Sequence, residues 1–235
     1  MERPRLSNLI MLVLLFLGAG TTIAQEISGE RQAPKSVDER LIASINAASG
    51  KSIFWDDVML GTSRSLMPVV IAVPAGQVVS GLINNDKPTI YAGLTVWAGT
   101  ALTVGIQELV VKPLVKRNRP YVDVEGVTNR DPDVFGYSFP SSHSGVSTGF
   151  AVGEALQYGK WYVTIPLAVY ASIVMFSRPY LGVHYPTDLL AGAILGSTIQ
   201  FLCYRLEQSL LAGSKNTIAR STASSPPVIS FSIKF

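Results

Sequence analysis

The chain has 235 residues, which is enough for one sizeable domain and short for two. Only 15% of the residues are charged and the mean hydropathy is +0.32, which is apolar for a soluble protein and indicates membrane helices. The net charge is +3, and the basic residues cluster in short motifs rather than in the long stripe that nucleic-acid binding favours. The single cysteine excludes an intrachain disulfide and a thiolate metal cluster.

Residues 1–24 have the pattern of a secretory signal. Arg3 and Arg5 form a basic start, residues 9–17 are apolar, and small residues precede Gln25. A cleaved signal peptide and an uncleaved signal anchor both fit this pattern. In either case the chain that follows lies outside the cytoplasm, which predicts a bacterial envelope protein.

Residues 25–65 form a polar to amphipathic N-terminal segment. Ser36-Val37-Asp38-Glu39 has the Ser-x-x-Glu pattern of a helix capping box. Apolar residues at helical spacing follow it, namely Leu41, Ile42 and Ile45. Phe54 and Trp55 fit either a membrane interface or packing against the main domain.

Residues 66–205 are predicted to form an all-α, membrane-embedded domain. It contains five segments with few or no charges, at residues 66–83, 88–111, 145–156, 161–176 and 189–204. A spanning helix needs about 17–25 residues, and segments 66–83, 161–176 and 189–204 lie near the lower limit of this range. Segment 145–156 is shorter and is the weakest. Their Gly, Ala, Ser and Thr content suits close helix packing in lipid, although a buried helical core has the same composition.

The order of these segments predicts that three motifs share one side of the membrane. If the chain starts outside, segments 66–83 and 88–111 enter and return, and segments 145–156 and 161–176 do the same. Lys112, His143 and residues 178–188 then lie together at the outer face. Basic residues fall at the inner ends, as the positive-inside tendency requires, namely Lys87, Lys160 and Arg205.

Residues 206–235 are predicted to be a polar, flexible tail. Its end alternates with strand period, through Ile229, Phe231, Ile233 and Phe235, and resembles the last strand of an outer-membrane barrel. One strand cannot make a barrel, and the predicted topology places the tail inside.

The first motif supplies cations that suit a phosphate group. Arginine grips two phosphate oxygens with its planar fork, and lysine provides a point charge. Lys112, Arg119 and Arg178 fit this task. Their neighbours Lys116 and Arg117 are expected to form a basic cluster that contacts lipid headgroups.

The only two histidines, His143 and His184, each follow residues suited to phosphate chemistry. Ser141 and Ser142 are N-cap candidates for a helix whose free N–H groups would bind an anion, although they also fit a purely structural cap. Asp188 lies four residues after His184, and Pro186 suits the first turn of a helix. Asp188 can then orient the imidazole ring for attack on phosphorus.

These residues resemble the type 2 phosphatidic acid phosphatase superfamily, which includes membrane lipid phosphatases, bacterial acid phosphatases and vanadium haloperoxidases. The family pattern is Lys-x6-Arg-Pro, then Pro-Ser-Gly-His, then Ser-Arg-x5-His-x3-Asp. The matching residues are Lys112, Arg119, Pro120, Pro140, Ser141, His143, Ser177, Arg178, His184 and Asp188. Ser142 replaces the glycine of the pattern and can supply its own hydroxyl or N–H group.

The resemblance implies a helical bundle with the site at its outer end. It makes His184 the nucleophile of a phosphohistidine intermediate, Asp188 its orienter and His143 the general acid. The phosphate would be held by Lys112, Arg119, Arg178, Ser141 and Ser142. The scheme uses no metal and no cofactor.

The leading functional hypothesis is a membrane lipid phosphatase at the periplasmic face of the bacterial inner membrane. Its substrate would be a polyprenyl diphosphate, lipid A phosphate, phosphatidylglycerophosphate or phosphatidic acid. One alternative is a periplasmic acid phosphatase that takes soluble phosphomonoesters with the same residues. Another is a non-catalytic phospholipid-binding protein.

Overall fold

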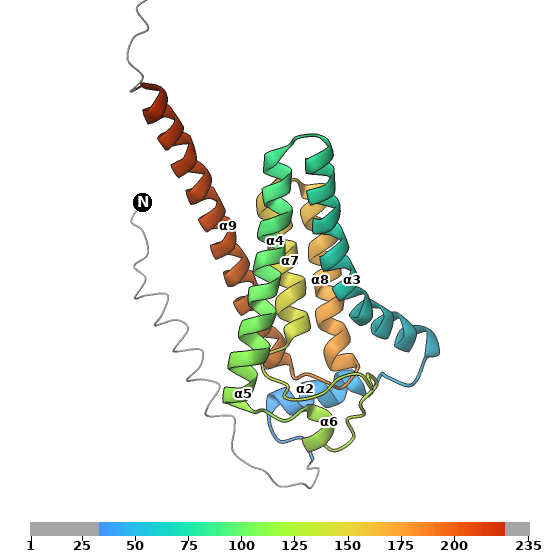
Figure 1. The fold of residues 1–235 in the computed structure, drawn as a ribbon. Coiled ribbons are helices and arrows are strands. Elements are labelled where there is room, and N and C mark those ends of the chain that lie inside the picture. Colours follow the sequence, from blue (N-terminus) through green and yellow to red (C-terminus); the bar gives the residue numbers. More distant parts are fainter. Residues whose placement is uncertain (1–32, 224–235) are drawn as a thin grey trace, which may run out of the picture.

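A computed structural model describes residues 33–223, with side chains described for residues 33–212. The predicted signal (1–24) and the alternating residues 229–235 lie outside this range. The described chain is helical and contains no β-strand, which confirms the all-α prediction (Figure 1). The helices are α2 (Val37–Asn46), α3 (Ile53–Ile83), α4 (Lys87–Ile106), a π-helical turn (Gln107–Val111), α5 (Lys112–Val115), α6 (Pro120–Asp123), α7 (Ser142–Tyr158), α8 (Trp161–Tyr180) and α9 (Pro186–Ala223).

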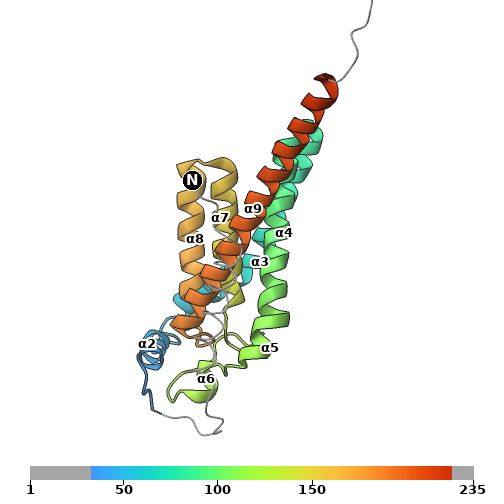
Figure 2. The same cartoon turned by 90° about the vertical axis from the view of Figure 1, so that its left-hand side faces the viewer.

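Four stretches of the described chain are long and apolar enough to cross a membrane, one fewer than expected. They are Ile53–Ile83, Lys87–Asp123, Trp161–Tyr180 and Pro186–Ala212. The fifth expected segment corresponds to α7, which has 17 residues and is rich in Gly and Ser. This helix packs against α4, α8 and α9 in the middle of the bundle (Figures 1 and 2). It therefore needs less apolar surface than its neighbours, which expose large apolar side chains outward.

Two helices extend beyond their predicted ends. Helix α3 begins at Ile53 rather than at residue 66, and α9 continues past residue 205 to Ala223. The predicted segments ended where charged residues begin, but charged residues do not interrupt an α-helix. Phe54 and Trp55, in the first turn of α3, are 66% and 53% exposed, so they do not pack against the main domain.

Helices α7 and α9 cross closely because small residues line their contact. A β-carbon at Gly196 of α9 would overlap the carbonyl oxygen of Gly145 on α7, and one at Gly192 would overlap that of Ser141. Small residues allow two backbones to approach in this way. The crossing fixes the first turn of α7 against the first turns of α9.

Gly196→Ala is expected to destabilise the protein by about 1–3 kcal/mol, because the added methyl group must push the two backbones apart. Gly76→Ala is the matched control, since a β-carbon at Gly76 meets no atom within 4 Å. Thermal unfolding of the two variants in detergent compares them. A Gly196→Ala midpoint equal to that of Gly76→Ala would contradict the close crossing.

The three sequence motifs meet at one end of the bundle. The α3–α4 and α7–α8 connections lie at the opposite end, so α5, the start of α7 and the α8–α9 connection come together (Figure 1). Helix α2 lies across this same end. Its predicted capping box is present, and Ile42 is fully buried against Val124, Val127 and Tyr185.

Candidate active site

A cavity of about 280 Å³ opens at the end of the bundle where the motifs meet. Its polar part holds nearly all of the predicted site residues, and its remaining wall is mostly apolar. The lining residues are Leu66, Met67, Val104, Glu108, Lys112, Arg119, Asp133, Val134, Phe135, Ser142, His143, Val146, Arg178 and His184. Of the predicted residues, Ser141 and Asp188 do not line the cavity and lie behind it.

His184 sits at the base of this cavity between a cation and a carboxylate. Its Nε2 atom is 3.2 Å from Nη1 of Arg119, and its Nδ1 atom is 3.6 Å from Oδ2 of Asp188. Asp188 is fully buried, and its Oδ2 accepts the backbone N–H of Tyr185 at 2.9 Å. Asp188 thus lies at the Nδ1 edge of the ring, and Arg119 lies at the Nε2 edge.

Burial lowers the pKa of His184 well below its usual value, and Arg119, Arg178 and Lys112 lower it further. The imidazole is therefore neutral at neutral pH. A neutral ring with its proton on Nδ1, facing Asp188, carries its lone pair on Nε2. The arrangement suits a nucleophile.

Arg178 is fully buried and lines the cavity from the end of α8. Its Nη1 atom donates to Ser63 Oγ and to Asp131 Oδ2, the latter at 3.0 Å. Its Nε and Nη2 atoms have no hydrogen-bond partner among the described residues. A buried guanidinium with two unpartnered nitrogen atoms, which together carry three N–H groups, is ready to bind an anion in the cavity.

The other two predicted cations are already engaged. Arg119 donates to the carbonyl oxygens of Phe135, Gly136 and Val183, at 2.8, 3.0 and 2.9 Å. Arg119 therefore holds the loop that contains Phe135 and Gly136, and it also contacts His184. Lys112 donates to Glu108 Oε1 at 2.7 Å, one helical turn away.

The two serines have different surroundings. Ser141 is fully buried, and its Oγ accepts the N–H of Ser144 as the N-cap of α7, at 3.4 Å. Ser142 begins the helix, lines the cavity and donates to Glu108 Oε1 at 2.5 Å. The side chain that reaches the cavity is thus that of Ser142, the position where the family pattern has glycine.

His143 lines the same cavity from the first turn of α7. Burial lowers its pKa well below the usual value, and the charge of Arg178 adds to this effect. A bound phosphate dianion would raise the pKa of His143 again, since an adjacent negative charge favours the protonated ring. His143 can therefore take up a proton together with an anionic ligand.

Arg117 does not contact lipid headgroups, and that prediction is wrong. Its side chain is only 11% exposed, and it pairs with Asp188 Oδ1 at 2.6 Å and with Asp38 Oδ2 at 2.7 Å. Its guanidinium also lies 3.7 Å from the centre of the Tyr185 ring. Nearby carboxylates from two other elements draw it inward, whereas Lys116 is exposed.

Several residues at the site were not found by reading the sequence. Glu108 and Lys112 stand four apart on one helix, a spacing that does signal a pair. Ser63, Asp131 and Asp38 come from distant segments, and nothing in their local sequence indicates a contact with Arg178 or Arg117. Only the fold brings them together.

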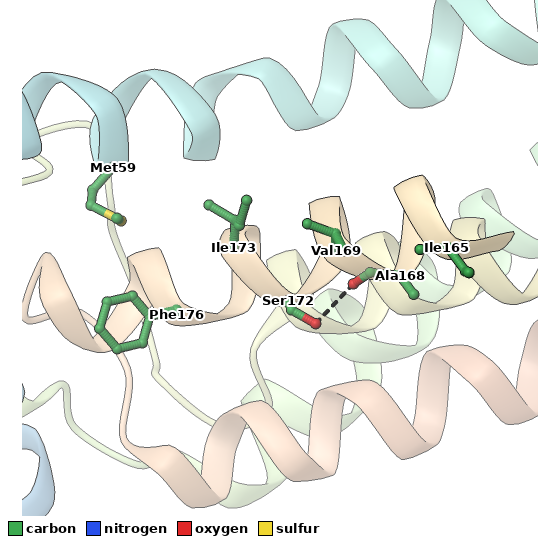
Figure 3. Close-up of a pocket in the computed structure, with 7 residues that line it drawn as sticks. All are labelled: Met59, Ile165, Ala168, Val169, Ser172, Ile173 and Phe176. Atoms are coloured by element: carbon green, nitrogen blue, oxygen red, sulfur yellow. Dashed lines mark hydrogen bonds between the residues drawn. The ribbon is translucent and has the colours of Figure 1, made fainter. Parts of the chain in front are cut away.

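A second, larger cavity of about 450 Å³ lies between α3 and α8 and carries no such chemistry (Figure 3). Six of its seven lining residues are apolar, namely Met59, Ile165, Ala168, Val169, Ile173 and Phe176. The seventh, Ser172, donates its hydroxyl to the Ala168 carbonyl oxygen of its own helix at 2.8 Å. The cavity therefore offers a wall of hydrocarbon and no titratable group.

Known proteins are similar to this chain in sequence and in fold. The chain is 34% identical over 187 residues to a lipid A 4'-phosphatase of Bacteroides thetaiotaomicron, covering 75% of this chain and 79% of that protein. It is 32% identical over 131 residues to an undecaprenyl-diphosphatase of Sulfolobus acidocaldarius, covering 56% of this chain and 63% of that protein. The second match thus spans less than two thirds of the relative's length.

A solved structure supports the fold. The transmembrane PAP2 type phosphatidylglycerolphosphate phosphatase of Bacillus subtilis superposes with a TM-score of 0.63 at 24% identity, over 85% of this chain and 96% of that one. The four apolar stretches indicate a membrane protein. The model of the PAP2 superfamily matches residues 92–211, which is half of the sequence. The chain therefore belongs to the PAP2 superfamily.

Proposed function

We propose that the protein is an integral membrane phosphatase that hydrolyses phosphomonoester or diphosphate groups of lipids through a phosphohistidine intermediate. The observation that carries the proposal is the buried Arg178, which has two unpartnered nitrogen atoms and lines a cavity together with both histidines. A cationic pocket with one neutral imidazole for attack and one for proton transfer matches phosphoryl transfer.

In the first step, Nε2 of His184 attacks phosphorus and the bond from phosphorus to the leaving oxygen breaks. His143, protonated alongside the bound phosphate, gives its proton to that oxygen. In the second step, His143 takes a proton from water while the water attacks phosphorus. The phosphorus–nitrogen bond breaks, which releases inorganic phosphate and restores free His184. The scheme requires no metal ion.

The walls of the cavity support a lipid substrate over a soluble one. Leu66 and Met67 of α3, Val104 of α4 and Val146 of α7 line it beside the cations. Val146 lies about one helical turn from His143, so the group attached to the leaving oxygen meets apolar side chains. A hydrocarbon chain suits this wall, and a soluble sugar phosphate would leave its hydroxyl groups without partners there.

The proposed location is the bacterial inner membrane, with the site facing the periplasm. An N-terminal segment outside the cytoplasm places the α2 end of the bundle outside. Lys87 and Lys160 stand at the opposite connections, and Arg205 lies about 28 Å along α9 from its start. These positions agree with the positive-inside tendency.

The test is release of phosphate by purified full-length protein in detergent. The panel contains a polyprenyl diphosphate, lipid A, phosphatidylglycerophosphate, phosphatidic acid and a water-soluble phosphomonoester. We expect turnover of at least one lipid that exceeds turnover of the soluble compound. Turnover of the soluble compound alone would favour the acid phosphatase alternative, and binding of lipids without turnover would favour the non-catalytic one.

A further inference from the structure

Asp188 shares its charge between His184 and a second partner. One carboxylate oxygen, Oδ2, faces Nδ1 of His184 at 3.6 Å, and the other, Oδ1, accepts from Nη1 of Arg117 at 2.6 Å. The side chain is completely buried. A buried carboxylate without a cation takes up a proton, and a protonated Asp188 could not stabilise a positive imidazole. Arg117 therefore favours the charged form of Asp188.

Arg117 is balanced in turn by Asp38 from helix α2. Nη2 of Arg117 donates to Asp38 Oδ2 at 2.7 Å, and both side chains are nearly buried, with 11% and 14% exposure. Asp38 also accepts the N–H and the hydroxyl of Thr187, at 3.1 and 2.6 Å. The hydroxyl of Thr187 accepts from Nη1 of Arg117 at 2.7 Å. These contacts fix the first turn of α9, which carries Asp188.

The charges in this chain of contacts do not cancel. Asp38 and Asp188 contribute two negative charges, and Arg117 contributes one positive charge. One negative charge thus remains for His184 as its ring becomes positive during attack. Without the charge of Asp38, Arg117 would act on Asp188 alone, and the pull of Asp188 on His184 would weaken.

Helix α2 is held in place by contacts that do not involve these charges. Asn46, at its far end, donates to the carbonyl oxygens of Tyr180 and Thr128, at 2.8 and 3.1 Å, and accepts the N–H of Thr128 at 2.7 Å. Ile42 is completely buried. Asp38 is thus presented to Arg117 by a docked helix. This helix lies outside residues 92–211, which the family model matches.

We propose that Asp38 and Arg117 are positioning residues for His184, so that α2 completes the active site from outside the matched family region. The inference rests on the proposed phosphohistidine chemistry. Both residues act through Asp188, and neither lines the cavity, so their loss should slow the attack on phosphorus without weakening the binding of the phosphate group.

The test compares Asp38→Asn, Arg117→Lys and the double variant with the wild type on a turned-over lipid. We expect kcat to fall about 10-fold for Asp38→Asn and about 30-fold for Arg117→Lys, whose ammonium cannot span two carboxylates. KM should change less than about twofold. Because the two residues act in series, the double variant should resemble Arg117→Lys rather than show the product of both losses.

Glu39→Gln is the matched control, because it removes a carboxylate from the same helical turn. In the described hydrogen bonds, the carboxylate of Glu39 accepts only from the backbone N–H groups of Lys35 and Ser36, and its loss should leave kcat unchanged. Titration with orthovanadate, a phosphate analogue, counts the intact sites. A full site count with reduced kcat supports positioning, and a kcat loss that merely follows a reduced site count overturns it.

The remaining outcomes separate this inference from the proposed function. Wild-type kcat in Asp38→Asn, alongside an inactive His184→Ala, overturns the role of Asp38 and leaves the phosphatase proposal standing. A wild-type protein that binds orthovanadate but releases phosphate from no substrate overturns the phosphatase proposal and this inference with it. Asp38→Asn decides the question even where Arg117→Lys fails to fold, because it changes charge with little change in shape.

Discussion

Replacement of His184 by alanine is expected to reduce phosphate release by at least about 10³-fold, because it removes the attacking nitrogen rather than a contact to the substrate. Binding of the lipid should change far less, since Arg178, Arg119 and Lys112 remain in the cavity. The measurement is phosphate release over time in detergent micelles, together with equilibrium binding of the same lipid.

Ser172→Ala is the control for this experiment. Its hydroxyl contacts only the backbone of its own helix in the apolar cavity between α3 and α8, so its removal should leave the rate unchanged (Figure 3). A His184→Ala variant that releases phosphate at the wild-type rate would exclude His184 as the nucleophile.

Replacement of His143 by alanine is expected to have the second largest effect, and one that depends on the leaving group. An alkyl oxygen is strongly basic and needs a proton as it departs, so turnover of a lipid monophosphate should fall by about 10²–10⁴. A nitrophenyl phosphate has a weakly basic leaving oxygen and should lose much less. The ratio of the two losses, measured on the same preparation, reports proton donation.

Equal losses on both substrates would contradict the role of His143 as a general acid. They would indicate instead that the ring only holds the phosphate. Its position is compatible with proton transfer, because His143 lies in the first turn of α7 and lines the cavity together with His184.

Much of the fold could be predicted from local features. Three features depend only on residues that are close in sequence: the apolar segments, the capping box at Ser36 and Glu39, and the proline before Asp188. The structure contains the helices that these features indicate. The order of the segments also predicted correctly that Lys112, His143 and His184 meet at one end. The exception was α7, whose burial within the bundle removes the need for a long apolar stretch.

The surroundings of the site could not be predicted, because they depend on contacts between distant segments. The local sequence of Arg117 suggests a cation that faces lipid. In the fold, Asp38 of α2, 79 residues away in the sequence, pairs with it. Ser63 and Asp131 reach Arg178 from two other elements in the same way. Charge alone could not distinguish Arg117, which is buried, from its exposed neighbour Lys116.

The central claim is that phosphate passes through a covalent bond to His184. The most direct measurement is rapid acid-free quenching of the wild-type protein during turnover of a ³²P-labelled lipid, followed by peptide mapping of the label. The account predicts label on the peptide that contains His184, lost on brief acid treatment and absent in His184→Ala. An active enzyme whose label lies on another residue would contradict it.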